Sequence, residues 1–235
     1  MSSTPRPYKR WQHFLSYLTD VSLASVEGDH TDHLEVVLRK GKVLLQANGA
    51  VYSWEDNYYN FVHAFNQLNW NKLSGEQCLL LGLGLGSVPQ LIEERHNRRL
   101  QYTCIEYDET VVALAEKYLL YRLTSPCEVI VADAERYVEL CRDRFHLIVL
   151  DLFVDDKVPA QFDTTSFLKQ VRALMAPGGV VISNRLTYTQ ADKRAAKRYY
   201  DTVYSEVFPN AAYLDVATNW MLFSDGSYLR DPALD

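Results

Sequence analysis

The sequence lacks several patterns that would assign it to a particular class of protein. Its four cysteines form no CxxC pair, its six histidines show no compact metal-binding spacing, and there is no internal repeat or low-complexity tract. No long apolar run follows the basic N-terminus, so neither a signal peptide nor a membrane-spanning helix is expected. We therefore predict a cytoplasmic protein with no metal and no membrane partner, in which Cys78 and Cys104 are buried thiols.

An excess of positive charge is also absent. The chain has 24 Lys and Arg residues against 30 Asp and Glu residues, a formal net charge of -6. This balance gives no general reason to expect nucleic acid and favours a neutral or cationic substrate. Lys193, Arg194, Lys197 and Arg198 gather in one segment, which on an acidic chain is interpreted as the solvated face of a helix.

The first quarter of the 235-residue chain differs in pattern from the rest. Residues 1–19 are interpreted as a disordered lead-in and a short amphipathic helix, whose apolar side (Trp11, Phe14, Leu15 and Leu18) is expected to pack into the core. Residues 20–56 alternate apolar and polar positions around a turn-like "RKGK", which predicts a small antiparallel β element. Residues 57–235 are expected to form one large α/β domain.

Within the large domain, helical and strand patterns alternate. After a helix at 57–70, strands are predicted at 78–83, 101–106, 128–132, 145–150 and 179–183. Helices are predicted at 88–97, 109–120, 134–141, 164–175 (ended by "APGG") and 189–206. Short connections between such elements predict a mostly parallel sheet with helices on both faces. Two further strands, near 211–216 and 219–224, should form an antiparallel hairpin at the sheet edge.

Chemistry-bearing residues follow successive strands of this sheet, where a ligand crevice is expected. The first strand leads into Gly82, Gly84 and Gly86, and a helix follows. The N-terminus of this helix offers unpaired backbone N–H groups and the positive end of the helix dipole to a ligand. The second ends at Glu106, next to Tyr107, where an acidic side chain suits two ribose hydroxyls. These residues are candidates for binding a nucleotide-like ligand.

The next two strands end in acids as well. Asp133, followed by Ala134, stands at the tip of the third strand and suits an adenine amino group, and Asp151 follows the fourth strand at the centre of the crevice. Asp133 or Glu106 alone is also explained as a helix cap. Four such signals at four successive strand tips nevertheless favour a nucleotide site, with Asp151 touching the reacting group.

The glycine spacing bears on which nucleotide is bound. A dinucleotide loop has the pattern G-x-G-x-x-G, whereas here the third glycine comes one residue early and basic residues near the turn are lacking. A sulfonium donor has no phosphates to hold, so an S-adenosyl donor is preferred over NAD. An NAD-binding oxidoreductase and a non-catalytic nucleotide-binding module remain alternatives.

These residues resemble the spermidine synthase-like (polyamine aminopropyltransferase-like) branch of the S-adenosylmethionine-dependent methyltransferase superfamily. The similarity runs from about Gly41 to Gly226 and includes, in order, "LLLGLGLGS", "CIEYDETVVALAEKYL", "VIVADAERYV" and "FHLIVLDLFVDD". It implies a seven-stranded Rossmann-like sheet, a small N-terminal β element, and a homodimer as one option for assembly. It also implies Glu106 on the ribose, Asp133 and the Ala134 backbone on the adenine, and Asp151 as the acid that orients and deprotonates an amine. Tyr58, or its neighbour Tyr59, matches a tyrosine of the acceptor pocket.

The chain departs from this family at three places. Leu85 occupies the position at which the family has an aspartate that holds the donor's amine. Val154 occupies the position of the family's second acid, and Asp155 and Asp156 come one and two positions later. Tyr52 occupies the position of a glutamine. We therefore expect a transferase that uses S-adenosylmethionine or its decarboxylated form as co-substrate. Methyl transfer to a small amine is placed marginally ahead of aminopropyl transfer, and a genuine spermidine synthase acting on putrescine is the main alternative.

Overall fold

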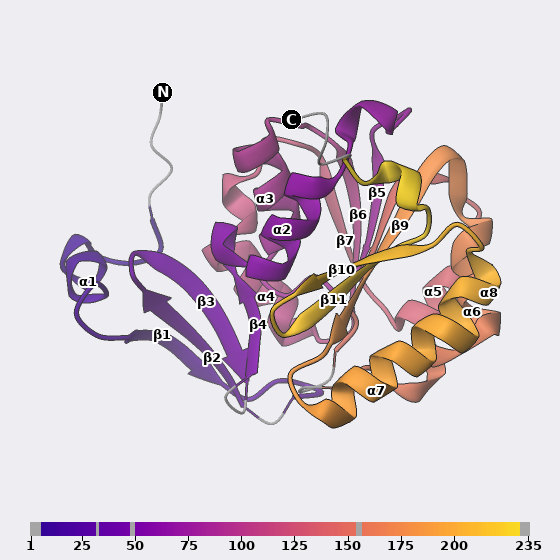
Figure 1. The fold of residues 1–235 in the computed structure, drawn as a ribbon. Helices are drawn as coiled ribbons and strands as arrows, with labels where there is room; N and C mark the ends of the chain where they lie inside the picture. The colour runs from indigo at the N-terminus through magenta and orange to yellow at the C-terminus, as the bar shows by residue number, and fades with distance from the viewer. Residues whose placement is uncertain (1–5, 32, 48–49, 154–156, 231–235) are drawn as a thin grey trace.

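The computed structural model describes residues 6–31, 33–47, 50–153 and 157–230. They form a small antiparallel sheet and a larger, mostly parallel one, and Figure 1 shows the small sheet beside the large one, next to helix α4 (Glu109–Tyr118). Val154, Asp155 and Asp156, on which one of the expected departures depends, lie outside the described residues.

The small sheet has four strands in the order β1-β2-β3-β4. They are β1 (Val21–Val26), β2 (Leu34–Arg39), β3 (Lys42–Ala47) and β4 (Ala50–Trp54). The predicted turn falls at Lys40 and Gly41, whose φ angles of 50° and 77° lie in the left-handed region that glycine adopts without strain. The inward side chains of this sheet form a buried cluster with Leu85 and with Val111, Leu114 and Tyr118 of α4.

Helix α1 (Arg10–Leu15) exists, but the prediction that its apolar side packs into the core is wrong. Trp11, Phe14 and Leu18 are 58%, 75% and 86% exposed, and no residue of α1 is buried. The segment is held by polar contacts instead. Lys40 N donates to Ser16 O at 2.8 Å, and Gly41 N donates to Ser16 Oγ at 2.9 Å. The helix is therefore anchored to the β2–β3 turn, and its apolar side faces outward.

The large sheet has seven strands in the order β10-β11-β9-β8-β5-β6-β7. The strands are β5 (Gln77–Leu81), β6 (Gln101–Glu106), β7 (Cys127–Val131), β8 (Phe145–Leu150), β9 (Met175–Leu186), β10 (Ala212–Val216) and β11 (Asn219–Phe223). The helices are α2 (Tyr59–Gln67), α3 (Ser87–His96), α4 (Glu109–Tyr118), α5 (Ala134–Leu140), α6 (Thr165–Ala173), α7 (Gln190–Tyr199) and α8 (Ser205–Val207). Single turns of 3₁₀ helix lie at Glu55–Asn57, Trp70–Lys72, Leu120–Arg122, Ala160–Asp163 and Gly226–Tyr228, and a π segment at Tyr200–Tyr204 joins α7 to α8.

Each face of the large sheet is covered by helices. Helices α2, α3 and α4 lie on one side of the sheet and α5, α6 and α7 on the other (Figure 1). The side chains of each group belong to a separate apolar cluster with the sheet. β9, β8, β5, β6 and β7 run parallel, whereas β11 and β10 add an antiparallel hairpin at the edge. The predicted fold class is therefore confirmed, as is the burial of Cys78 and Cys104.

One boundary differs from its prediction, at a glycine that lies close to the backbone of the neighbouring strand. The "APGG" segment was expected to end a helix, but α6 ends at Ala173 and β9 begins at Met175. A Cβ on Gly179 would lie 3.0 Å from Phe145 O, a tight contact, so glycine eases the approach of this part of β9 to β8.

At β5, the order of the strands along the chain departs from their order in the sheet. The chain passes from β5 outward to β6 and β7, then returns to β8 on the other side of β5. This reversal opens a crevice beyond the carboxyl ends of β5 and β8, which is where α/β sheets of this kind bind ligands.

Candidate active site

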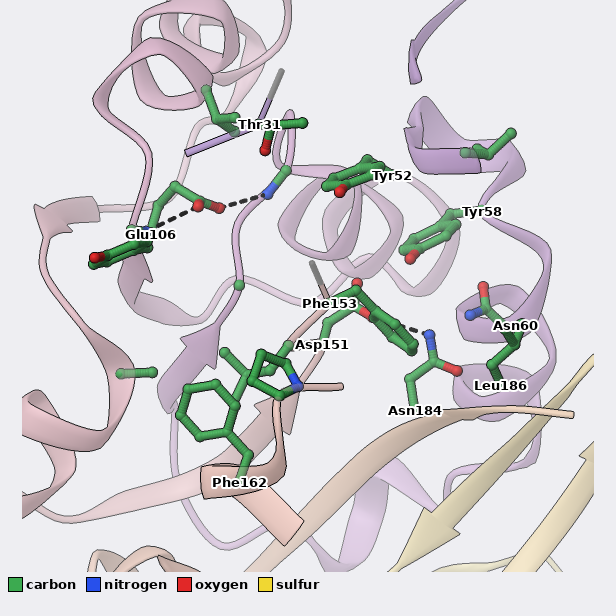
Figure 2. Close-up of a pocket in the computed structure, with 18 of the residues that line it drawn as sticks. Thr31, Tyr52, Tyr58, Asn60, Glu106, Asp151, Phe153, Phe162, Asn184 and Leu186 are labelled. Atoms are coloured by element: carbon green, nitrogen blue, oxygen red, sulfur yellow. Dashed lines mark hydrogen bonds between the residues drawn. The ribbon is translucent and has the colours of Figure 1, made fainter. Parts of the chain in front are cut away.

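A cavity of about 850 Å³ occupies this crevice. Its walls come from the tips of the parallel strands, from the start of α2 and from parts of the small sheet. Figure 2 shows Asp151 near the middle of the labelled residues, with Glu106 on one side and Asn184 and Tyr58 on the other. Among the predicted site residues, Tyr58, Gly82, Gly84, Glu106, Tyr107, Asp133, Ala134 and Asp151 all line the cavity.

The glycine loop follows β5 with three residues in the left-handed region. The φ angles of Gly82, Gly84 and Gly86 are 90°, 54° and 92°, which side chains rarely adopt. A Cβ on Gly82 would lie 2.1 Å from Asp151 O, so this glycine lets the β5 and β8 tips meet. Gly82 and Gly84 line the cavity, whereas Gly86 lies behind it as the N-cap of α3, where a Cβ would lie 2.5 Å from a Leu120 methyl carbon.

Glu106 binds the backbone of two loops. One carboxylate oxygen accepts from Leu83 N and Gly84 N at 3.0 and 3.2 Å, and the other accepts from Tyr107 N and Asp108 N at 2.8 and 3.2 Å. Burial raises the pKa of Glu106, and these four hydrogen bonds act in the opposite direction. A carboxylate has about four lone-pair sites, so a ribose would share this side chain with the backbone.

Tyr107 carries an aromatic stack at the cavity edge. Its ring lies 3.8 Å, centroid to centroid, from the His30 ring, at an interplanar angle of 24°. His30 belongs to the β1–β2 connection, which is tied to the β6 tip because His30 N donates to Asp108 Oδ2 at 3.0 Å. The small sheet therefore contributes directly to the wall of the cavity.

Asp133 is both a helix cap and a residue of the cavity wall. Its Oδ1 accepts from Arg136 N at 2.9 Å, so it caps α5, and the residue also lines the cavity. Its Oδ2 interacts with Gln161 Nε2 at 3.4 Å. Ala134, the first residue of α5, lies beside it in the wall.

Asp151 lies between neighbours that donate hydrogen bonds to it. Asn184 Nδ2 donates to Asp151 Oδ1 at 2.9 Å (Figure 2). The pKa of Asp151 is raised to about 7, mainly by burial; hydrogen bonds from Asn184 and Tyr58 oppose this rise, and the charge of Glu106 adds to it. A carboxylate with a pKa near neutral pH is suited to accept a proton from a substrate.

The structure distinguishes the two neighbouring tyrosines. Tyr58 interacts with Asp151, and its pKa is raised well above its usual value, by burial first and then by the Asp151 charge. Tyr59 lines the cavity too, but it is 57% exposed and its ring packs against His63, 4.2 Å away between centroids. Tyr58 is therefore the tyrosine next to the candidate reaction centre.

Several wall residues were missed by sequence reasoning. Asn184 follows the apolar run of β9, and Asn219 begins β11. Asn184 could have been found in the sequence as a polar residue at the end of the fifth predicted strand. Asn60, Asp192 and His30 carried no recognisable motif. Tyr52, one of the family departures, also lines the cavity, whereas Leu85 is fully buried under the small sheet.

Two negative findings concern the described residues. In that part of the chain, no group of three or more His, Cys, Asp or Glu side chains is arranged to hold a metal ion. No helix among the same residues is long and apolar enough to cross a membrane.

Comparison of the sequence with known proteins finds relatives of one kind. A polyamine aminopropyltransferase of Vibrio vulnificus is 28% identical over 137 residues, which are 57% of this chain and 45% of the relative. A probable polyamine aminopropyl transferase of Bifidobacterium longum is 27% identical and covers 64% of this chain and 34% of its own length. Polyamine aminopropyltransferase 2 of Hyperthermus butylicus is 27% identical, with 68% and 57% covered. The chain thus spans between a third and just over half of the length of these relatives. No family model matches it.

Solved structures with the same fold include a probable spermidine synthase from Corynebacterium glutamicum, with a TM-score of 0.69, 20% identity, and 85% of this chain and 78% of that chain covered. A spermidine synthase in complex with the transition-state analogue AdoDATO has a TM-score of 0.66 at 17% identity, with 86% and 72% covered. Human Methyltransferase-like protein 13 in complex with SAH has a TM-score of 0.58 at 22% identity, with 76% and 86% covered. The chain is thus related in sequence to polyamine aminopropyltransferases and shares the fold of spermidine synthases, which confirms the predicted resemblance to the spermidine synthase-like branch of the S-adenosylmethionine-dependent methyltransferase superfamily.

Proposed function

We propose that the chain is a transferase that moves the aminopropyl group of decarboxylated S-adenosylmethionine to the nitrogen of a small amine. The sequence relatives support the reaction class, since all of those described above carry the name of this activity. In this proposal the adenosyl part of the donor lies against the glycine loop, Glu106, Tyr107 and Asp133, and the acceptor amine lies near Asp151 and Tyr58.

The observation that carries the proposal is the charge of the cavity wall. Five carboxylate side chains line it (Glu106, Asp108, Asp133, Asp151 and Asp192), and no Lys or Arg does among the described residues. Such a wall favours a sulfonium donor with an ammonium group and an amine acceptor. It offers no cationic side chain to a donor carboxylate, so it suits the decarboxylated donor better than S-adenosylmethionine itself.

Asp151 is the proposed base. The acceptor nitrogen attacks the methylene carbon next to the sulfonium, the carbon–sulfur bond breaks, and its electron pair neutralises the sulfur. The nitrogen loses a proton, which Asp151 accepts. The sulfonium carbon is already electrophilic, so the main tasks of the protein are to align the amine and to remove its proton.

The earlier preference for methyl transfer is not supported. It depended on Leu85 and Val154 as apolar side chains at the places of two amine-holding acids, and Val154 lies outside the described residues. Leu85 is fully buried among residues of the small sheet and α4 and is absent from the cavity wall. Its apolar character is explained by packing. The human methyltransferase neighbour is only 22% identical, so that likeness concerns the fold alone.

The test is a transfer assay with purified protein, decarboxylated S-adenosylmethionine and a panel of di- and polyamines, read by mass spectrometry. We expect an amine product heavier by one aminopropyl group, which Asp151→Asn should nearly abolish while donor binding survives. Asp215→Asn, which changes an exposed carboxylate of β10, is the control and should leave the rate unchanged.

Three outcomes would contradict the proposal in different ways. A methylated product with S-adenosylmethionine, and none with the decarboxylated donor, would assign methyl transfer. Thermal stabilisation by NAD and by neither adenosyl donor would favour an oxidoreductase. Binding of adenosyl donors without any product across the panel would favour a non-catalytic module.

A further inference from the structure

Two asparagines connect Asp151 to the edge of the large sheet. Asn184 Nδ2 donates to Asp151 Oδ1 at 2.9 Å, and Asn219 Nδ2 donates to Asn184 Oδ1 at 2.8 Å. In the β9–β11 pairing, Asn219 is opposite Leu186 and Asn184 is opposite Met221. The two asparagines are thus diagonal neighbours on one face of the sheet, a separation that side-chain amides span.

The direction of this chain of hydrogen bonds follows from the groups involved. An ionised carboxylate only accepts, so Asn184 must turn its NH₂ group toward Asp151. Its carbonyl oxygen then faces Asn219, which must donate in turn. The remaining Asn219 oxygen accepts from Thr218 Oγ1 at 3.0 Å. Every hydrogen bond in the chain therefore points toward Asp151.

Three neighbours act on the Asn184 amide: Asp151 and Tyr58 in the cavity, and Asn219, which donates to its oxygen. Removing Asn219 takes away the donor that holds this oxygen and makes the reversed amide more accessible. A reversed amide would place a carbonyl oxygen against Asp151, where it repels a carboxylate and accepts from a protonated acid. Asn184 is only 3% exposed, and removing Asn219 takes away the side chain that donates to its oxygen. The titratable groups that face Asp151 from other elements are Tyr58, before α2, and Glu106, at the β6 tip, and neither interacts with Asn219 in the described contacts.

We propose that Asn219 is a positioning residue that fixes the amide orientation of Asn184 and thereby keeps Asp151 as a hydrogen-bonded carboxylate, ready to accept a proton. The inference rests on the proposed role of Asp151 as base. It gives the antiparallel hairpin, which otherwise only closes the sheet edge, a part in the chemistry of the site.

The experiment measures the protonation of Asp151 without substrate. The melting temperature is recorded between pH 5 and pH 9 for the protein with and without Asp151→Asn, and the difference between the two curves reports the titration of Asp151. The same pair is then measured with Asn219→Leu and with Asn219→Gln. The control is Asn210→Leu, because Asn210 is exposed and its described contact uses only its backbone oxygen, with Gly226 N.

We expect Asn219→Leu to move the midpoint upward by about one pH unit, a tenfold change in the ratio of ionised to protonated Asp151. Asn219→Gln keeps a side-chain amide, so its midpoint should lie close to that of the wild type. Asn210→Leu should leave the midpoint unchanged. If Asn219→Leu does not fold, Asn219→Ala removes the same amide and must give the same shift. An unchanged midpoint, even with a lower melting temperature, would mean that Asn219 is merely structural and would overturn the inference.

A kinetic measurement separates this inference from the proposed function. The acidic limb of the kcat/KM profile should move with the stability midpoint if Asp151 is the base. A midpoint that moves while the kinetic limb stays fixed would retain the positioning role of Asn219 and remove Asp151 from the proposed mechanism.

Discussion

Glu106 accepts a hydrogen bond from the Leu83 backbone N–H at 3.0 Å, so the tip of β6 holds the glycine loop that follows β5. The same carboxylate accepts three further backbone N–H groups. It therefore shapes two loops of the cavity wall before any ligand arrives.

Replacing Glu106 by Gln should weaken the binding of an adenosyl donor about 10- to 100-fold. The amide turns an NH₂ group toward N–H groups that need an acceptor, and hydrogen bonds to charged groups contribute about 1.5–3 kcal/mol. Isothermal titration calorimetry measures the loss. Glu109→Gln, at an exposed position in the first turn of α4, is the control. Unchanged affinity in Glu106→Gln would remove Glu106 from the donor site.

Asp151→Asn should stabilise the fold at pH 8 more than at pH 5. The pKa of Asp151 is raised from 3.8 to about 7 on folding, so its protonated form favours the folded state. Stability is lost as the pH rises through this interval, and the full penalty is present above pH 7. Asparagine does not ionise, so the gain is at most about 4 kcal/mol, at about 1.4 kcal/mol per pKa unit. Urea unfolding at several pH values measures it. A gain that is equal at pH 5 and pH 8 would contradict the raised pKa.

Tyr58→Phe and Tyr59→Phe form a matched pair. Removing the Tyr58 hydroxyl deprives Asp151 of one of its hydrogen-bonding neighbours, so we expect kcat/KM for the amine to fall about tenfold, as for the loss of one hydrogen bond to a charged group. Tyr59→Phe should change it less than twofold because that ring is largely exposed. Steady-state kinetics with saturating donor compares them. The reverse ranking would assign the acceptor role to Tyr59.

Leu85→Asp should unfold the protein more readily than Leu85→Ala. The alanine variant leaves a cavity that costs about 2–5 kcal/mol, whereas the aspartate also buries a carboxylate among apolar side chains. Denaturant titration ranks the two. A Leu85→Asp protein that is as stable as wild type and binds decarboxylated S-adenosylmethionine more tightly would show that this side chain reaches the donor after all.

Much of the large domain was predictable because its parallel strands are continuous apolar runs that end in glycines or acids. The strand at 145–150 was predicted with its observed bounds, and 101–106 likewise. The start of β9 was missed because "APGG" is typical of a helix stop, and only the approach of Gly179 to β8 shows its role in the strand.

The small elements were harder to predict because periodicity does not say what an apolar face meets. Trp11 and Phe14 have helical spacing, yet α1 is anchored through Ser16 and leaves them outside. In the site, the acids at strand tips stood out in the sequence, whereas Asn184 and Asn219 gain their meaning from strand register. Leu85 was interpreted as a missing acid because a motif position does not indicate the direction of a side chain.

The glycine loop also touches the small sheet. A Cβ on Gly84 would lie 3.0 Å from Ser53 Cβ, and the hydroxyls of Ser53 and Ser87, at the start of α3, are 2.6 Å apart. The loop thus lies between β4 and the cavity. A local opening of the loop therefore weakens contacts of β4 as well, so the free energies of opening of the two segments are coupled. A ligand that reduces the motion of the loop should slow amide hydrogen exchange along β4. Exchange in the small sheet would then report whether the cavity is filled.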